Sequence, residues 1–172
     1  VHASTLPDTT AGFTLDRKCS SGLNAIALAA RGIICDEIDV AVAGGVESIS
    51  LTLNKHAPAY RNRSQAVLKA DHTAYMQMIE TAENLRRQYG ISRDEQDELA
   101  VESHLRAVRA QKDGILAEEI VPVTVAGKRS EQVIDTDEQP RADISLNSLA
   151  ALAPIMSKVD ADATVTAGNA SG

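Results

Sequence analysis

Cys19 is the residue whose type and setting could do chemistry in this sequence. It lies between residues 12–15, which are typical of a short strand, and residues 23–34, where Ala, Leu and Ile are found at nearly every position. A helix that is apolar on all sides is predicted to be buried. Ser20 and Ser21 are placed to cap its first N–H groups. The positive end of a helix favours a reactive thiolate, although position alone fits a buried core cysteine equally well.

Cys35 is expected to be a second free thiol. It follows Cys19 at the far end of the same predicted helix, about 24 Å away at a rise of ~1.5 Å per residue. A disulfide needs Cα atoms within about 7 Å of each other, so these two cysteines are not predicted to pair. Free thiols suit a reducing compartment, and we therefore expect a cytoplasmic protein.

Other polar side chains are not predicted to form a site. The four histidines have no metal-ligand spacing with each other or with the cysteines, so no metal is expected. His104 is interpreted as a surface residue. The acidic residues of the same predicted helix are interpreted as a solvated face, which comprises Asp94, Glu95, Asp97, Glu98 and Glu102.

Composition argues against several kinds of partner. The formal net charge of −7 disfavours nucleic acid and membrane surfaces, and 2% aromatic residues leave little for base stacking. An apolar run of the roughly 20 residues that span a membrane is not found in the sequence.

Patterning predicts an α/β fold. Residues 38–43 form a predicted strand that ends at Gly44-Gly45, and the strand–helix–strand order implies a right-handed crossover in a parallel sheet. The paired glycines fit a tight turn or a close backbone approach to a neighbouring loop.

Residues 51–160 are predicted to be rich in helix. One helix runs from about residue 75 to Gly90, and a capping box at Ser92 opens a second that reaches about Lys112. The buried face of the second is predicted to hold Val101, Leu105 and Val108. Residues 120–125 and 132–136 are predicted as a hairpin, 145–152 as a short helix and 163–167 as a last strand.

The segment Cys-Ser-Ser-Gly-Leu-Asn-Ala-Ile, which starts at Cys19, closely resembles the nucleophile segment of the thiolases. Residues 43–50 (AGGVESIS), 81–84 (TAEN) and 166–172 (TAGNASG) resemble further thiolase motifs in the same order. The resemblance implies part of an α/β thiolase fold, with a parallel-type sheet, a buried nucleophile helix and a large α-rich loop insertion. Thiolases are much longer, so we interpret the chain as the middle of a longer protein.

The resemblance also implies a division of the chain. Residues 1–50 are expected to belong to the N-terminal thiolase-fold domain, which carries the nucleophile. Residues 51–160 are expected to form an α-rich loop domain that binds coenzyme A. Residues 161–172 are expected to return to the first domain as a strand.

The chemistry that the resemblance implies is acyl transfer through an acyl-Cys19 intermediate. The Cys19 N–H would form part of an oxyanion hole, and no cofactor is expected besides the coenzyme A thioester, which is the substrate. Thiolases take a base and a second cysteine from their C-terminal half. Neither Cys35 nor any histidine here matches those motifs, so this chain alone is expected to be inactive. A homodimer or homotetramer is implied, with residues 13–18 at a subunit interface.

Contacts with coenzyme A are likewise implied by the resemblance. Met78 is expected beside the acyl and pantetheine part, and Arg141 beside the nucleotide end. Without the resemblance, Met78 fits a helix core and Arg141 an exposed loop. Gln77 and Ile79 depart from the short-chain members of the family, which leaves the acyl-chain preference open, and Met156 replaces an aromatic residue. The remaining expected contacts are Ser148, Met156, Ala167, Ser171 and Gly172.

Two alternatives remain open at this point. A decarboxylating ketosynthase shares the fold and a cysteine at a buried helix, but it lacks the insertion that carries residues 81–84. A non-catalytic thiolase-like protein could bind acyl-CoA or act as an assembly partner. Sequence downstream of Gly172 would separate that alternative from an enzyme.

Overall fold

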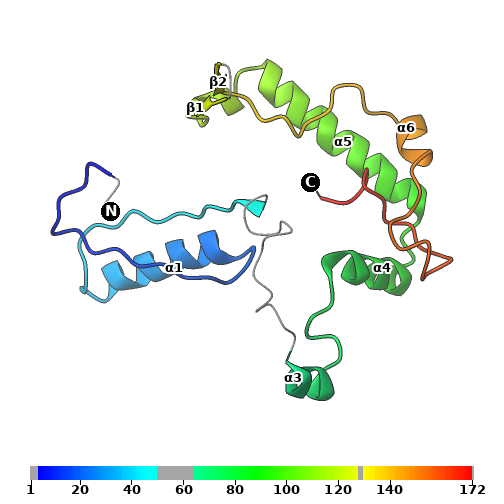
Figure 1. Cartoon of the computed structure of the whole chain (residues 1–172), viewed down its shortest axis with the longest axis horizontal. Coiled ribbons are helices and arrows are strands. Elements are labelled where there is room, and N and C mark those ends of the chain that lie inside the picture. Colours follow the sequence, from blue (N-terminus) through cyan, green and yellow to red (C-terminus); the bar gives the residue numbers. More distant parts are fainter. Residues whose placement is uncertain (1–3, 50–63, 128–129, 172) are drawn as a thin grey trace. The chain divides into compact units, whose positions relative to one another are not determined.

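The computed structural model describes residues 4–49, 64–127 and 130–171 (Figure 1). It divides into two compact units, Val1–Asn62 and Arg63–Gly172, and each is described by itself. Both helices and strands are present. Within the described ranges, no helix combines the length and the apolar character needed to cross a membrane.

In unit 1 (Val1–Asn62), the main element is helix α1, Ser21–Ile34, which ends at Cys35. A turn follows, in which Asp36 has a φ of 56° and the Glu37 N–H donates to the Gly32 carbonyl at 3.0 Å. The chain then runs back alongside the helix in an extended form (Figure 1). Gly32 makes room for it, because a Cβ built there would lie 3.1 Å from Ile38 Cδ1.

Two predictions for this unit are corrected. Residues 12–15 and 38–43 are not strands, because a strand needs ladder hydrogen bonds and the described residues pair neither segment. Helix α1 contains no buried residue, and Leu23 is 75% exposed. An apolar helix is buried only where other elements cover it, and within the described part of unit 1 the extended chain covers one side.

Unit 2 (Arg63–Gly172) contains the predicted helical hairpin. Helix α4, Met78–Tyr89, ends at Gly90 with a φ of 68°, and α5 spans Arg93–Lys112. The Ser92 hydroxyl accepts the Glu95 N–H at 3.2 Å, which confirms the predicted capping box. Helix α3, Gln65–Ala70, was not predicted from the sequence.

Beyond α5, the described residues form mostly turns and irregular segments. A 3₁₀ turn, η1 (Leu116–Glu118), leads to β1 (Val123–Ala126), which pairs antiparallel with β2 (Glu131–Ile134). The predicted hairpin is thereby confirmed. Helix α6, Leu146–Ala150, is shorter than predicted.

Residues 163–167 were predicted as a strand and are not one. The N–H groups of Thr164 and Val165 donate to the Glu83 carboxylate instead of a neighbouring strand, both at 2.8 Å. The return of this segment to the first domain stays a prediction.

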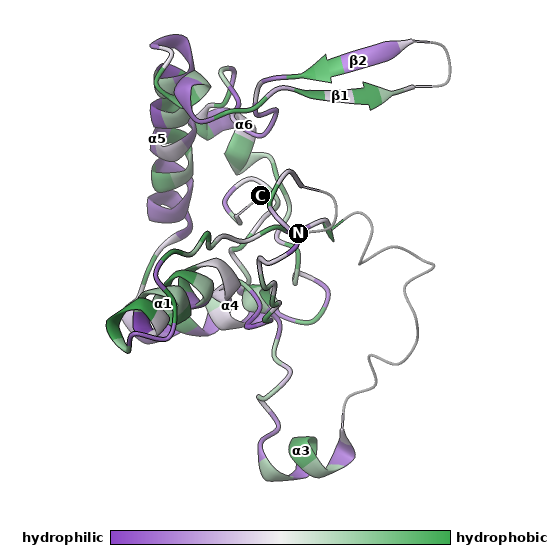
Figure 2. Cartoon of the chain, turned by 90° about the vertical axis from the view of Figure 1, so that its left-hand side faces the viewer, coloured by the Kyte–Doolittle hydropathy of each residue, from purple (hydrophilic) through white to green (hydrophobic). Residues whose placement is uncertain are grey.

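The buried residues of unit 2 are few and unusually polar. Hydrophilic and hydrophobic positions alternate along α5 in Figure 2, and Val108 is the member of its predicted face that is buried, whereas Leu105 is 44% exposed. Among the described residues, the buried apolar ones are Val108, Leu149, Ala163 and Val165, and the buried polar ones are Glu83, Asp97 and Thr166. Polar contacts therefore carry much of the packing in this unit.

Candidate active site and coenzyme A surface

The turn that precedes Cys19 is held by side chains from both directions. Lys18 has a φ of 54°, which is uncommon for a residue other than glycine. Its N–H donates to Asp16 Oδ1 at 2.7 Å, and its carbonyl accepts the Ser21 hydroxyl at 2.7 Å. The same hydroxyl accepts the Arg17 N–H at 2.8 Å. These contacts support a backbone conformation that presents Cys19, an exposed residue, directly before α1.

The serines do not cap α1 as predicted. Ser20 is the N-cap residue, but its side chain makes no capping hydrogen bond, and its φ and ψ of −92° and 3° differ from the usual extended cap geometry. Ser21 instead uses its hydroxyl for the preceding turn. Arg17 adds a second link, because its Nη1 donates to Asn24 Oδ1 at 3.2 Å.

Gly45 lies against the first turn of α1. A Cβ built on Gly45 would lie 3.1 Å from Gly22 Cα and 3.3 Å from Gly22 N, whereas one built on Gly44 would meet nothing within 4 Å. Of the two interpretations of the paired glycines, the structure supports a close backbone approach, at Gly45, but the neighbour is the first turn of α1 and not a loop. Gly45 thereby lies against Gly22, which follows Cys19 by three positions in the sequence.

In unit 2, Glu83 is a buried carboxylate, 1% exposed, that fixes residues 164 and 165. Its Oε1 accepts their two N–H groups, and its Oε2 accepts Arg86 Nε at 2.8 Å. Arg86 also donates to the Asp162 carbonyl. Burial raises the pKa of Glu83, but the Arg86 guanidinium and the two N–H donors outweigh it and leave the pKa below its ordinary value.

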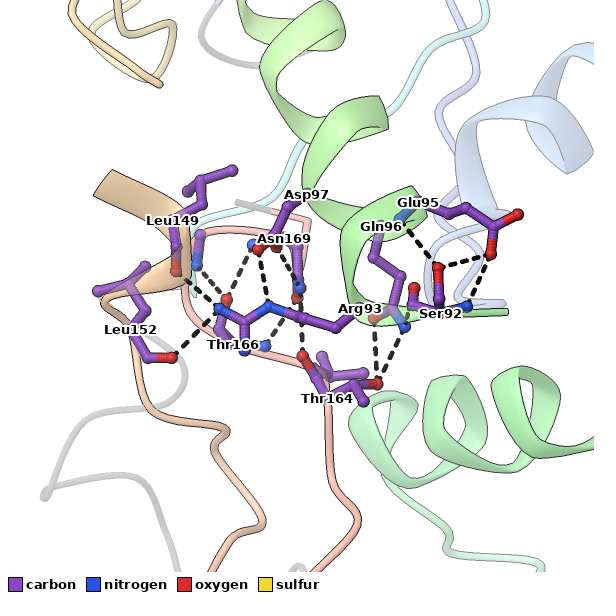
Figure 3. A network of polar contacts seen from close by, with 12 residues as sticks. Ser92, Arg93, Glu95, Gln96, Asp97, Leu149, Leu152, Thr164, Thr166 and Asn169 are labelled. Carbon is purple, nitrogen blue, oxygen red and sulfur yellow. Dashed lines mark hydrogen bonds and ion pairs between the residues drawn. The ribbon is translucent and has the colours of Figure 1, made fainter. Parts of the chain in front are cut away.

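Asp97 is a second buried carboxylate, and it contacts the loop that follows. Its Oδ1 accepts Asn169 Nδ2 at 2.8 Å, and its Oδ2 accepts Arg93 Nε at 2.8 Å (Figure 3). The prediction that Asp97 belongs to a solvated face is therefore wrong. Helical spacing reveals the pairing of Asp97 with Arg93 but not its contact with Asn169, which lies 72 positions away in the sequence.

His104 is half-buried rather than a plain surface residue. Its Nδ1 accepts the backbone N–H of Arg141 at 3.1 Å. Seven residues further along α5, Gln111 Nε2 donates to the Asp137 carbonyl at 2.8 Å. One face of α5 thus holds the segment that carries Arg141.

The predicted coenzyme A contacts with described positions all lie in unit 2, and Cys19 lies in unit 1. Met78 begins α4 and is 75% exposed. Ser148 is exposed on α6, where its Oγ accepts the Ser145 N–H at 3.0 Å in a capping box. Arg141, Ala167 and Ser171 are exposed, and Met156 is half-buried. Gly172 lies outside the described residues. The structure leaves the roles of these residues as predictions.

Comparison with known proteins identifies the class of this α/β chain. Residues 1–172 match the family model described as "Thiolase, N-terminal domain", and the chain belongs to the thiolase family. It resembles the solved structure of acetyl-CoA acetyltransferase from Bacillus anthracis, with a TM-score of 0.78 and 42% identity over 96% of this chain and 44% of that one. That likeness confirms the predicted α/β thiolase fold class.

Curated relatives agree with this assignment. Over 97% of its length, the chain is 41% identical to "Beta-ketoadipyl-CoA thiolase" of Pseudomonas aeruginosa. It is 40% identical to "Probable acetyl-CoA acyltransferase" of Staphylococcus aureus over the same share. The chain spans 44% of the length of each of these relatives.

Proposed function

We propose that the intact protein is a thiolase that transfers acyl groups between coenzyme A thioesters through Cys19. The observation that carries this proposal is the setting of Cys19, exposed at the N-terminus of α1 after a turn held by Asp16 and Ser21. The N-terminal end of a helix stabilises negative charge, both on a thiolate and on the oxyanion of a tetrahedral intermediate.

The proposed reaction has two half-reactions. The Cys19 thiolate attacks the thioester carbonyl, a new C–S bond forms, and the bond to coenzyme A sulfur breaks, so that coenzyme A leaves and takes a proton. In the second half, a coenzyme A thiolate or the enolate of a second thioester attacks the acyl group and releases Cys19. The Cys19 N–H is expected to stabilise the oxyanion. The base and the second cysteine would come from sequence beyond this chain.

Coenzyme A binding is proposed for unit 2, with contacts from Met78, Arg141, Ser148, Met156, Ala167, Ser171 and Gly172. The relatives' names, one a beta-ketoadipyl-CoA thiolase and the other an acyltransferase, support a coenzyme A thioester substrate. We further propose a cytoplasmic homodimer or homotetramer. A non-catalytic relative that only binds acyl-CoA is the second candidate, and it is favoured if Cys19 is never acylated.

The two cysteines provide an internal control for the test. Both are exposed, but Cys19 precedes the N-terminus of α1 and Cys35 is its C-cap, where the helix dipole has the opposite sign. In the intact protein, acetyl-CoA should leave an acetyl group on the Cys19 peptide in mass spectrometry and none on Cys35. Iodoacetamide should alkylate Cys19 much faster than Cys35, and acyl-CoA should slow the first reaction alone.

Two variants complete this experiment. Cys19→Ser should abolish turnover, and Cys35→Ala should retain it. Equal alkylation of both thiols, or no protection of Cys19 by acyl-CoA, would contradict the assignment of the nucleophile.

A further inference from the structure

The loop from Thr166 to Ala170 is closed by its own polar groups. The Asn169 side chain accepts the Thr166 N–H through Oδ1 at 2.7 Å. In return, the Thr166 hydroxyl accepts the N–H groups of Gly168 and Asn169 at 3.2 and 3.3 Å. Thr166 is fully buried, at 0% exposure, while Ala167 and Ser171 remain exposed on either side. The Asn169 side chain therefore determines how these two residues are presented.

Asp97 connects this loop to helix α6. Its Oδ1 accepts Asn169 Nδ2, and its Oδ2 accepts Arg93 Nε, each at 2.8 Å. The same Arg93 donates through Nη2 to the carbonyls of Leu149 and Leu152 at 2.7 and 3.2 Å (Figure 3). A continuous series of contacts thus runs from the loop through α5 to the end of α6.

Apolar packing also holds the loop against the end of α6, independently of these hydrogen bonds. A Cβ built on Gly168 would lie 2.6 Å from Leu152 Cδ1, and Leu149, which it would also meet, is only 4% exposed. The backbone of the loop therefore lies directly on the two leucines whose carbonyls Arg93 binds. Loop and helix are held together by van der Waals contact and by charge-assisted hydrogen bonds.

We infer that Asp97 and Arg93 are positioning residues for the coenzyme A surface. They hold the loop that carries Ala167 and Ser171 in a fixed position relative to Ser148 on α6. Neither charged side chain is itself proposed to touch the ligand. The inference rests on the proposed function for the identity of that ligand. On that basis, acyl-CoA affinity depends on the part-buried ion pair of Arg93 and Asp97, which holds the proposed contact residues in place.

The proposed role of Asp97 can be tested by replacing its carboxylate with an amide of the same size. Both neighbours of the Asp97 carboxylate are N–H donors, Asn169 Nδ2 and Arg93 Nε. An amide at position 97 can accept from one of them but presents an NH₂ group to the other. Asp97→Asn therefore removes one part-buried contact while preserving the side chain's size.

The test measures acyl-CoA and a nucleotide-free thioester separately in the intact protein. With Asp97→Asn, we expect KM for acyl-CoA to rise about tenfold, the loss of roughly one charge-assisted hydrogen bond. The kcat should change less than about twofold, and acylation of Cys19 by a short N-acetylcysteamine thioester should keep the parent rate. Asp94→Asn is the matched control, because Asp94 is exposed on the same turn of α5, and it should behave as the parent.

A second variant keeps the test decisive if Asp97→Asn folds poorly. Arg93→Lys retains the positive charge beside Asp97 but cannot reach both leucine carbonyls with a planar group, so KM for acyl-CoA should rise by a smaller factor. Parent-like acyl-CoA kinetics in both variants would overturn the inference. Equal losses with both thioesters would overturn it too, since they would indicate general destabilisation. Failure of the parent protein to acylate Cys19 would instead refute the proposed function.

Discussion

The Oε1 atom of Glu83 accepts the backbone N–H of Val165 at 2.8 Å, across 82 positions of sequence. The same atom accepts the Thr164 N–H at 2.8 Å, so one carboxylate oxygen from α4 serves two successive donors. In a sheet, those donors would need carbonyls of a neighbouring strand. Successive N–H groups of a β-strand point to opposite sides, so two that meet at one carboxylate oxygen show that this segment is not a regular strand.

Replacing Glu83 by glutamine should destabilise the protein in a pH-dependent way. The amide oxygen can still accept the two N–H groups, but the amide nitrogen would face the Arg86 guanidinium, which Glu83 Oε2 now binds at 2.8 Å. We expect the free energy of unfolding at neutral pH to fall by about 1.5–3 kcal/mol, the value of a hydrogen bond to a charged group. Urea titration would measure it, and Glu98→Gln, at an exposed position on α5, is the control.

The sign of the pH dependence follows from the lowered pKa of Glu83. A carboxyl whose pKa is lower in the folded protein stabilises the fold above its unfolded pKa, and that stabilisation is lost as pH falls through the folded pKa. The stability difference between the parent and Glu83→Gln should therefore be constant near neutral pH and shrink below about pH 4. A difference that stayed constant at acid pH would show that the charge of Glu83 is not involved.

Adjacent glycines give a second prediction, about the Cys19 turn. Gly45→Ala should impair Cys19 acylation, because the new methyl group would lie 3.1 Å from the Gly22 backbone in the first turn of α1. Backbone in a helix cannot move aside as a flexible side chain can, and overpacking of this kind costs about 1–3 kcal/mol.

Gly44→Ala is the matched control for that substitution, since its methyl group would meet nothing within 4 Å. The rate of Cys19 alkylation and the free energy of unfolding should both remain near parent values in the control. Equal behaviour of the two variants would mean that the contact between Gly45 and Gly22 does not support the Cys19 turn.

Features set by neighbouring residues could be predicted from the sequence. The Ser92 capping box and the left-handed Gly90 are local signals, and they correctly placed the hairpin of α4 and α5. A close backbone approach of the paired glycines was one of two interpretations, but the sequence indicated neither the start of α1 as the neighbour nor Gly45 as the residue involved.

Features set by distant partners could not be predicted. Asp97 and His104 have polar neighbours on α5, and their spacing looks like that of a solvated face. Their partners Asn169 and Arg141 lie 72 and 37 positions away, and only the folded chain brings them together. The burial expected for α1 also failed, because hydropathy shows that a helix needs cover but does not supply the covering element.

Arg141 gives the last prediction, which concerns the nucleotide end of coenzyme A. Its side chain is exposed, and its backbone is held by His104, so the guanidinium is available to a ligand from a fixed position. A guanidinium can bond a phosphate and stack on adenine. Arg141→Ala should therefore weaken acyl-CoA binding about tenfold at low salt, and by less at high salt, where exposed charges are screened.

One control separates this local effect from a loss of net positive charge, and two variants of His104 test the backbone contact. Arg106→Ala removes the same charge from an exposed ion pair with Glu102 on α5, and it should leave acyl-CoA binding unchanged. His104→Leu removes the acceptor of the Arg141 N–H and should weaken binding by a smaller factor, whereas His104→Asn keeps an acceptor and should largely restore it. Isothermal titration of the intact protein with acyl-CoA would measure each affinity. If Arg141→Ala bound as tightly as the parent at low salt, Arg141 would be an ordinary loop residue, and the nucleotide end of the ligand would have to lie elsewhere.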